Sequence, residues 1–292
     1  MNKSTLLFLS VLILTVFACK NEPKNADPNM PSGFVPGETA DPTVLAGHWI
    51  DLDFCARAAQ YGSVLQTMNN SHAPYAYAFT FNPAMPDSVT CFNAFESWNL
   101  PVKYKKDTLE LVGAIQNQKP VFLVYHSHGD KDMTMFDNSN GRTQIDNFIK
   151  SKAGTKDGYA AFQTALNHHL FSGQFSTVGK KPADKILFSP GGFIMGLKEY
   201  DRFNVCTGGD CFVAGQEIDV ITFSNSKQKE GSEKMFGYKY SNGNDTLYFY
   251  NLVNAKPEEK GGYKVGTVAY KFARAFSVPV ANGNKPAAQK PQ

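Results

Sequence analysis

The chain has 292 residues, of which 42% are hydrophobic and 13% aromatic, and its formal net charge at pH 7 is +3. A charge balance this even, with no basic cluster interleaved with aromatic residues, argues against a nucleic-acid partner. The aromatic residues include 23 Phe and 13 Tyr, and both β-sheets and ligand cavities favour such side chains. The composition therefore favours a β-rich domain.

Residues 1–18 have the features of an export signal. Lys3 supplies a positive charge near the start, and the stretch from residue 6 to residue 18 is almost entirely apolar. Because this stretch is shorter than the roughly 20 residues that a membrane-spanning helix needs, it predicts a signal peptide.

The end of this signal, Val16-Phe17-Ala18-Cys19, resembles the lipobox of bacterial lipoproteins. In that family the Cys is acylated, with palmitate as a typical chain, and becomes the first residue of the mature protein. The resemblance implies a lipid anchor on Cys19 and a place in the cell envelope, at the outer membrane on its periplasmic or surface face. The alternative is an ordinary signal peptide that happens to end at a cysteine.

Both ends of the mature chain are expected to be disordered. Residues 19–44 contain five prolines among polar residues, and such a stretch buries too little apolar surface to order itself. It is expected to act as a flexible tether with a reach of about 30 Å. Residues 277–292 have a similar composition and predict a disordered tail. No Pro- or Ser-rich linker divides the remainder, so residues 45–276 are expected to form one β-barrel domain.

Four cysteines remain besides Cys19, and an oxidising compartment would allow them to form disulfide bonds. Cys206 and Cys211 flank a turn-forming tetrapeptide, and a bond between them would stabilise the fold by roughly 2 kcal/mol. Cys55 and Cys91 would then pair by default. Three pairings are possible, and spacing alone does not choose among them. Zinc binding by Cys206 and Cys211 is a further alternative, although no second pair of ligands lies nearby.

Alternation of large and small residues predicts the first run of strands. From Tyr75 to Phe81 every large residue falls on one face of a strand. The segments on either side of residues 128–131 predict a hairpin. Besides a strand that begins near Trp49, the candidate strands of the first run cover residues 75–81, 89–98, 108–114, 121–125 and 132–136.

Residues 141–171 differ from the strands on either side. Ile145, Phe148 and Ile149 have helical spacing, and so do apolar residues between 159 and 169. This pattern predicts a helical insert made of two short helices. Another helix is expected just after the first strand, from Phe54 to Met68. The candidate strands of a second run cover residues 185–188, 193–205, 218–223, 236–240, 246–252 and 263–274.

About ten strands in two runs, with a helical insert between them, predict a mainly β fold in which an antiparallel meander closes into a barrel. The sequence from Leu45 to Trp49 contains a Gly-x-Trp and resembles the opening of lipocalin-like (calycin-type) barrels. The resemblance implies that Trp49 plugs the barrel floor and that Arg274, on the last strand, packs against it. The two helical segments depart from that family's pattern, and the insert could cover the mouth of the barrel.

A barrel of eight or more strands can hold one small ligand, and such cavities are mostly apolar. The favoured interpretation is an exported, lipid-anchored protein that binds a small apolar or amphipathic ligand in the barrel cavity. Its partners would be that ligand and, through the lipid, the membrane. An interior that the same side chains fill completely is the alternative. The candidate cavity residues are Trp49, Tyr75, Tyr77, Phe79, Phe81, Tyr248 and Tyr250.

One segment points to a possible enzyme. His126-Ser127-His128-Gly129-Asp130 resembles the start of the metallo-β-lactamase motif His-x-His-x-Asp-His, whose imidazoles and carboxylate bind zinc. Lys131 stands where the motif has its last His, so a polar hairpin tip is favoured. A metal-dependent hydrolase that uses His126, His128 and Asp130 is the alternative function.

No other motif for catalysis or cofactor binding stands out. The sequence has no Gly-x-Ser-x-Gly elbow, phosphate loop or dinucleotide fingerprint. No cofactor is therefore expected, and a binding protein is favoured over an enzyme. Asp51 and Asp53 alternate on the first expected strand, where they favour a solvated edge. A surface assembly or adhesion component without a small ligand is a third interpretation, which a large exposed apolar patch would support.

Overall fold

The structure is a computed structural model, and it describes residues 40–70, 74–116, 118–127, 132–137, 144–208, 218–228, 233–241, 243–254 and 263–275. The predicted signal peptide, Cys19, nearly all of the tether and the C-terminal tail lie outside the described residues. His128, Asp130 and Cys211 also lie outside them.

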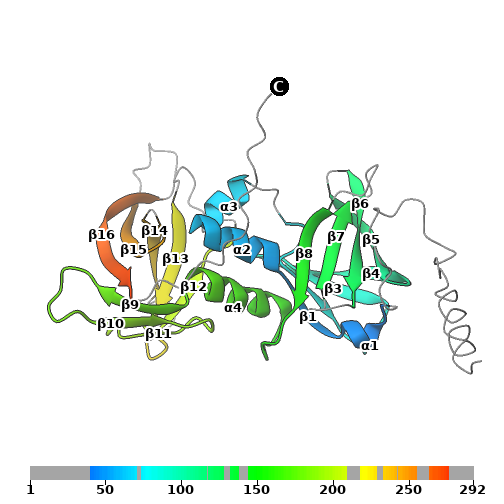
Figure 1. Cartoon of the computed structure of the whole chain (residues 1–292), viewed down its shortest axis with the longest axis horizontal. Coiled ribbons are helices and arrows are strands. Elements are labelled where there is room, and N and C mark those ends of the chain that lie inside the picture. Colours follow the sequence, from blue (N-terminus) through cyan, green and yellow to red (C-terminus); the bar gives the residue numbers. More distant parts are fainter. Residues whose placement is uncertain are drawn as a thin grey trace, which may run out of the picture.

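The first half of the described chain forms a closed barrel of eight antiparallel strands, on the right of Figure 1. Consecutive strands pair throughout, and β1 closes the ring by pairing with β8, where Ile50 lies opposite Ile149. Such closure leaves no free strand edge. The strands are β1 (Gly47–Asp51), β2 (Ala78–Phe81), β3 (Ser88–Phe92), β4 (Ser97–Lys105), β5 (Thr108–Gln116), β6 (Lys119–His126), β7 (Asp132–Asp137) and β8 (Gln144–Lys150).

Aromatic and aliphatic side chains pack the interior of this first barrel. Trp49 and Tyr125 meet edge to face with ring centroids 6.0 Å apart, and the rings of Phe79 and Phe148 are 4.8 Å apart. A short helix, α1 (Pro42–Leu45), lies beside one end of the barrel (Figure 1). There the carbonyl of Leu45 accepts a hydrogen bond of 2.7 Å from Trp49 Nε1, so the indole is both buried and satisfied.

At the other end of β1 the chain turns directly into helix α2 (Leu52–Tyr61), which is followed by α3 (Val64–Asn70). The carboxylate of Asp51 accepts a hydrogen bond of 2.8 Å from the backbone N of Phe54, which makes Asp51 the N-cap of α2. The helix ends at Gly62, whose left-handed conformation is typical of a glycine C-cap. These two helices confirm the helical segment that the sequence predicts after the first strand.

Helix α4 (Gly158–Leu170) lies between the first barrel and the strands that follow it (Figure 1). Asp157 is its N-cap and accepts a hydrogen bond of 2.7 Å from the backbone N of Ala160. The helix approaches the barrel closely at its first turn, because a Cβ at Gly158 would lie 2.8 Å from the ring of Phe92. A larger residue at position 158 would push the helix away from β3.

The remaining strands form a second antiparallel sheet of eight strands, on the left of Figure 1, in the order β11-β10-β9-β16-β15-β14-β13-β12. Its two end strands meet through an isolated bridge between Phe193 and Arg202, so the sheet curls into a barrel-like shape. The strands are β9 (Gly173–Thr177), β10 (Lys185–Phe188), β11 (Ile194–Met195), β12 (Arg202–Val205), β13 (Asp219–Ser224), β14 (Lys234–Tyr240), β15 (Thr246–Asn254) and β16 (Tyr263–Arg274).

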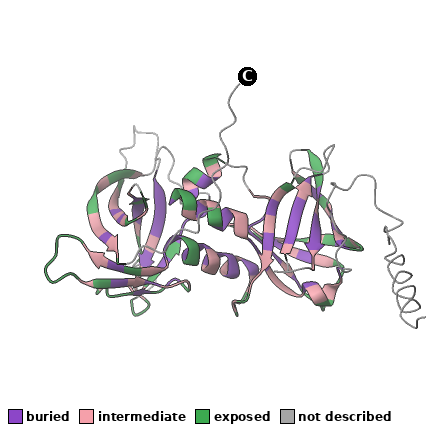
Figure 2. Ribbon diagram, viewed as in Figure 1, coloured by how far each residue is buried: buried purple, intermediate pink, exposed green. Residues whose placement is uncertain are grey.

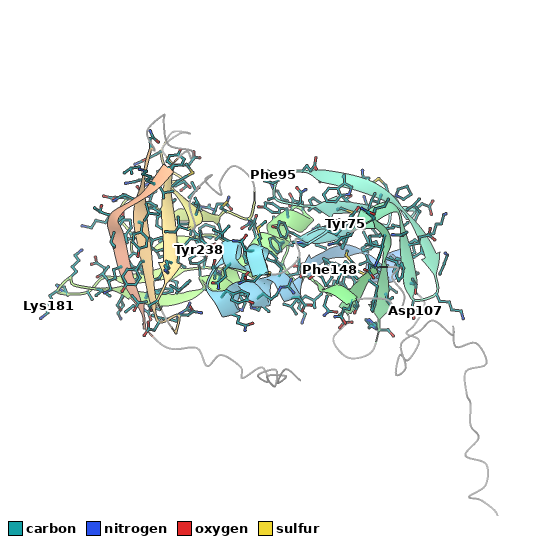
Figure 3. The ribbon with its side chains drawn as sticks, turned by 90° about the horizontal axis from the view of Figure 1, so that it is seen from above. Tyr75, Phe95, Asp107, Phe148, Lys181 and Tyr238 are labelled. Carbon is teal, nitrogen blue, oxygen red and sulfur yellow. The ribbon has the colours of Figure 1, made fainter. Side chains whose placement is uncertain are left out.

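A core rich in phenylalanine fills the second sheet and continues through the helices to the outer wall of the first barrel. Figure 2 shows buried residues on the strands of both halves and on the helices between them, and Figure 3 shows Phe148 and Tyr238 in different halves. Phe188 is central to this core. Its ring contacts those of Phe171, Phe175, Phe203, Phe223, Phe249 and Phe272.

The mainly β fold, the antiparallel meander barrel and the helix between two runs of strands are confirmed. The two runs, however, form two separate sheets rather than one closed sheet. The first of the two helices predicted in the insert is wrong, because residues 144–150 form β8. Phe148 faces the barrel interior while Ile149 packs against the helices, and apolar residues on both faces of a strand can imitate helical spacing.

The expected contact between Arg274 and Trp49 is absent, since the last strand belongs to the second sheet. The Arg274 guanidinium lies 4.9 Å from the centre of the Phe175 ring and donates a hydrogen bond of 3.2 Å to the carbonyl of Ser172. The cation near Trp49 is instead Lys150, whose Nζ is 5.9 Å from the ring centroid. This placement corrects the role that the barrel resemblance implied for Arg274.

Candidate functional site

Four of the predicted cavity residues belong to the first barrel. Trp49, Phe79 and Phe81 are buried in its interior, and Tyr75 is half-buried against the same cluster, where its ring lies 5.9 Å from that of Trp98. The interior rings touch one another and the surrounding aliphatic side chains. These residues therefore pack against one another in the barrel interior.

Tyr77 does not face the barrel interior as expected. Its ring stacks on Phe162 of α4, and its hydroxyl donates a hydrogen bond of 2.6 Å to the carbonyl of Thr207. The reason is local, since β2 begins only at Ala78 and the alternation of a regular strand does not extend back to Tyr77.

Tyr248 and Tyr250 do not line a cavity either. They are half-buried on the outward face of β15, because the alternate residues Leu247 and Phe249 fill the core of the second sheet. The prediction placed both tyrosines on an inner wall, and the division of the strands into two sheets explains the difference.

The predicted hairpin around the His126 segment is confirmed, with His126 of β6 opposite Asp132 of β7. His126 Nε2 lies 3.0 Å from the hydroxyl of Thr134, which donates a hydrogen bond of 2.9 Å to Asn147 Oδ1. Among the residues that the structure describes, no three His, Cys, Asp or Glu side chains are placed to hold a metal ion. His128 and Asp130 lie outside those residues, so the hydrolase alternative stays a prediction.

Asp51 and Asp53 do not form the solvated edge that their spacing suggests. Asp51 is fully buried where β1 meets α2, and Asp53 accepts a hydrogen bond of 2.8 Å from Asn147 Nδ2. Burial, reinforced by the charge of Asp146, raises the pKa of Asp51 well above its usual range. Arg57 donates a hydrogen bond of 3.0 Å to Asp146 Oδ1, so this polar group joins α2 to the end of the first barrel.

Cys55 and Cys91 are both free, which corrects their expected pairing. Cys91 lies in the interior of the first barrel, whereas Cys55 of α2 lies in the core between that barrel and the second sheet. The barrel wall therefore separates the two sulfur atoms. The pairing of Cys206 with Cys211 stays a prediction, because Cys211 lies outside the described residues.

A groove of about 430 Å³ runs between α4 and the segments before and along β12. Tyr159, Gln163 and Asn167 form one wall, since residues four apart lie on the same face of a helix. The opposite wall includes Gly192 and Phe203. Gly192 has a φ of +78°, and a Cβ there would lie 2.9 Å from the carbonyl oxygen of Phe203, so only glycine allows this close approach.

The two amides in this groove are held through their nitrogen atoms. Gln163 Nε2 donates hydrogen bonds of 2.7 Å to Tyr159 Oη and 3.4 Å to the carbonyl of Val205. Asn167 Nδ2 donates a hydrogen bond of 3.1 Å to the carbonyl of Pro190. Because a backbone carbonyl can only accept, these contacts determine the orientation of both amides.

The oxygens of the same amides, Gln163 Oε1 and Asn167 Oδ1, have no hydrogen-bond partner among the described residues. The two side chains are only 9% and 4% exposed. A buried acceptor without a partner costs about 1–3 kcal/mol, and a ligand in the groove could donate the missing bonds. Sequence reasoning missed this site, although polar residues at i and i+4 beside the apolar Phe162 and Leu166 were an available signal.

A second hollow, of about 320 Å³, lies beside β16 and is lined by charged groups. Tyr270 Oη donates a hydrogen bond of 2.9 Å to Glu199 Oε2, and Lys180 pairs with Asp184. Four of the polar groups there thus pair with one another, which makes the groove beside α4 the better candidate site.

Comparison of the chain with family models, curated proteins and solved structures gave no match.

Proposed function

We propose that this chain is an exported, lipid-anchored binding protein of the cell envelope that holds a small amphipathic ligand in the groove beside α4. The observation that carries the proposal is that Gln163 and Asn167 both line this groove and that their buried amide oxygens, Oε1 and Oδ1, lack a partner among the described residues. Acceptors prepared in this way favour a ligand that supplies donors.

The chemistry of the groove defines the class of ligand. Two hydroxyl or amine groups must reach acceptors on residues four apart in the helix, a rise of about 6 Å along the helix axis. Tyr159 lines the same groove and offers apolar contact to the rest of the ligand, whereas the ring of Phe203 packs in the core against Phe171 and Phe188. A sugar or an amino alcohol, with donors at two sides of an apolar frame, fits this description. The proposal thus moves the ligand from the barrel interior, where rings pack together, to the groove.

The envelope location rests on the sequence, through the export signal and the lipobox resemblance that ends at Cys19. The described helices include none that is both long and apolar enough to cross a bilayer. Incorporation of labelled palmitate into the wild-type chain, and its loss in Cys19→Ala, would test the anchor separately from the groove.

Ligand binding can be tested with a panel of hexoses, polyols and amino alcohols by saturation-transfer NMR. We expect members of the panel to bind and the near-isosteric variants Gln163→Met and Asn167→Leu to bind them more weakly. One lost hydrogen bond of about 1 kcal/mol corresponds to roughly fivefold in affinity. Together the two substitutions should weaken binding by more than tenfold.

Gln174→Met is the matched control, since Gln174 is exposed on β9 outside the groove. Circular dichroism and melting curves would establish that each variant folds. The proposal would be refuted if no member of the panel bound the wild-type protein, or if folded Gln163→Met and Asn167→Leu bound as tightly as the control.

A further inference from the structure

Three neighbouring strands of the second sheet have an unusual charge composition. β14, β15 and β16 contain no Asp or Glu. Figure 1 shows β16 on the side of the second sheet that is turned away from the helices. The basic residues of these strands are Lys234, Lys239, Lys264, Lys271 and Arg274. For a chain whose overall charge is nearly balanced, this is a local concentration of positive charge.

The strand register brings two of these lysines to either side of one tyrosine. Lys239 of β14 pairs with Tyr248 of β15, and Tyr248 pairs in turn with Lys271 of β16. All three side chains face outward, because the residues that alternate with them are buried in the core. Lys271 Nζ lies 5.0 Å from the centre of the Tyr248 ring, within the range of a cation–π contact.

Apolar and aromatic surface continues directly from this row. Tyr250 stacks on Tyr248 with ring centroids 6.3 Å apart, and it pairs with Val268, which is 49% exposed. Val265, further along β16, is 42% exposed. We call this surface the lysine–tyrosine face and define it by six residues: Lys239, Tyr248, Tyr250, Val265, Val268 and Lys271.

We infer that the lysine–tyrosine face lies on the surface of a membrane that contains anionic phospholipid. Each lysine near such a surface contributes about 1 kcal/mol of attraction, and no carboxylate on these strands opposes it. Tyrosine is enriched at the level of lipid headgroups, and exposed valines can enter the boundary with the acyl chains. A soluble acidic polymer would engage the lysines but would leave the valines uncovered, which is why we favour the membrane.

The inference is independent of the groove beside α4, and vesicle sedimentation tests it. The chain without residues 1–19 keeps every described residue and carries no acyl group, so it isolates the contribution of the face. We expect it to bind phosphatidylglycerol vesicles more tightly than phosphatidylcholine vesicles, with an affinity that falls as salt is added. The double variant Lys239→Glu/Lys271→Glu should bind phosphatidylglycerol at least about thirtyfold more weakly, because two contributions of about 1 kcal/mol each are lost and the new carboxylates add repulsion.

Two further variants make the test specific. Lys103→Glu/Lys227→Glu makes the same change in net charge at two exposed lysines outside the lysine–tyrosine face. This variant should bind phosphatidylglycerol vesicles like the parent chain. Tyr248→Ser/Tyr250→Ser leaves the charge unchanged and should still weaken binding several-fold. Equal binding to both lipids, no binding, or equal losses in the two lysine double variants would overturn the inference. The inference would also be overturned if soluble polygalacturonate displaced the chain from vesicles while Tyr248→Ser/Tyr250→Ser bound vesicles as tightly as the parent chain. The lysines would then bind an acidic polymer rather than a membrane.

Discussion

Tyr77 and Phe162 stack nearly face to face, with ring centroids 4.5 Å apart and ring planes at 13°. Tyr77 immediately precedes a strand of the first barrel and Phe162 belongs to α4, so the stack joins the barrel to the helix that carries the groove. The hydroxyl of Tyr77 also donates a hydrogen bond to the carbonyl of Thr207, next to β12, and so connects the barrel to the second sheet. One side chain thus touches three parts of the molecule.

Substitutions at Tyr77 should therefore weaken the whole fold. Tyr77→Phe keeps the stack but leaves the buried Thr207 carbonyl without its donor, and we expect a loss of about 1 kcal/mol in the free energy of unfolding. Tyr77→Ala should cost about 3–5 kcal/mol. Urea denaturation measures both. Tyr104→Phe is the control, since Tyr104 makes its hydrogen bond at an exposed site; an equal effect of Tyr104→Phe and Tyr77→Phe would contradict the role of Tyr77.

Phe188 should be among the most sensitive positions of the second sheet. It is 1% exposed and contacts six other phenylalanine rings. Phe188→Ala should lower the free energy of unfolding by about 3–5 kcal/mol, because the surrounding rings cannot collapse into the space it leaves. Phe95→Ala, at a ring that is 67% exposed, should change it by no more than about 0.5 kcal/mol. Similar melting temperatures for the two variants would argue against this core.

Asp51 should make stability depend on pH. Its pKa in the folded state is raised by burial and by Asp146, whereas in the unfolded chain it is about 3.9. The folded protein therefore holds a proton that the unfolded chain releases, so the free energy of unfolding should fall as pH rises above about 4 towards the raised folded value. Asp51→Asn keeps an N-cap for α2 and should remove this part of the dependence.

Thermal unfolding across that pH interval measures the effect. Asp245→Asn is a suitable control, because Asp245 is exposed and its pKa is lowered by its bond to Ser241. If Asp51→Asn kept the pH dependence of the wild-type protein, Asp51 would not be the group that titrates.

Cys55 and Cys91 should be present as unreactive thiols. Burial raises the pKa of Cys91 to about 12, and burial with the nearby charge of Asp51 raises that of Cys55 well above its usual value. A thiol that is buried and protonated is a poor nucleophile. We expect neither to react with iodoacetamide in the folded protein and both to react after denaturation without reductant. Peptide mapping checks this. If neither cysteine reacted after denaturation, the result would instead support a Cys55–Cys91 disulfide.

Periodicity was enough to predict most individual elements. The hairpin on either side of residues 128–131 was predicted from a turn between two short runs, and a helix was also expected after the first strand, from Phe54 to Met68. Residues 89–98 were harder, because a turn at Asn93 divides them into β3 and β4. Each of these features depends on neighbours in the chain, to which sequence patterns are sensitive.

The sequence by itself determined that the chain is mainly β, that its strands pair as a meander and that a helix separates two runs. Only the tertiary structure decided that the runs form two sheets, that a barrel wall separates Cys55 from Cys91, and that Gln163 and Asn167 line a groove. The reason is that alternation specifies which side chains share a face of a strand, but not which other face covers them. Phe79 packs inside the first barrel, whereas Tyr77 packs between that barrel and α4. Contacts between residues far apart in the sequence decide which of the two positions a ring takes.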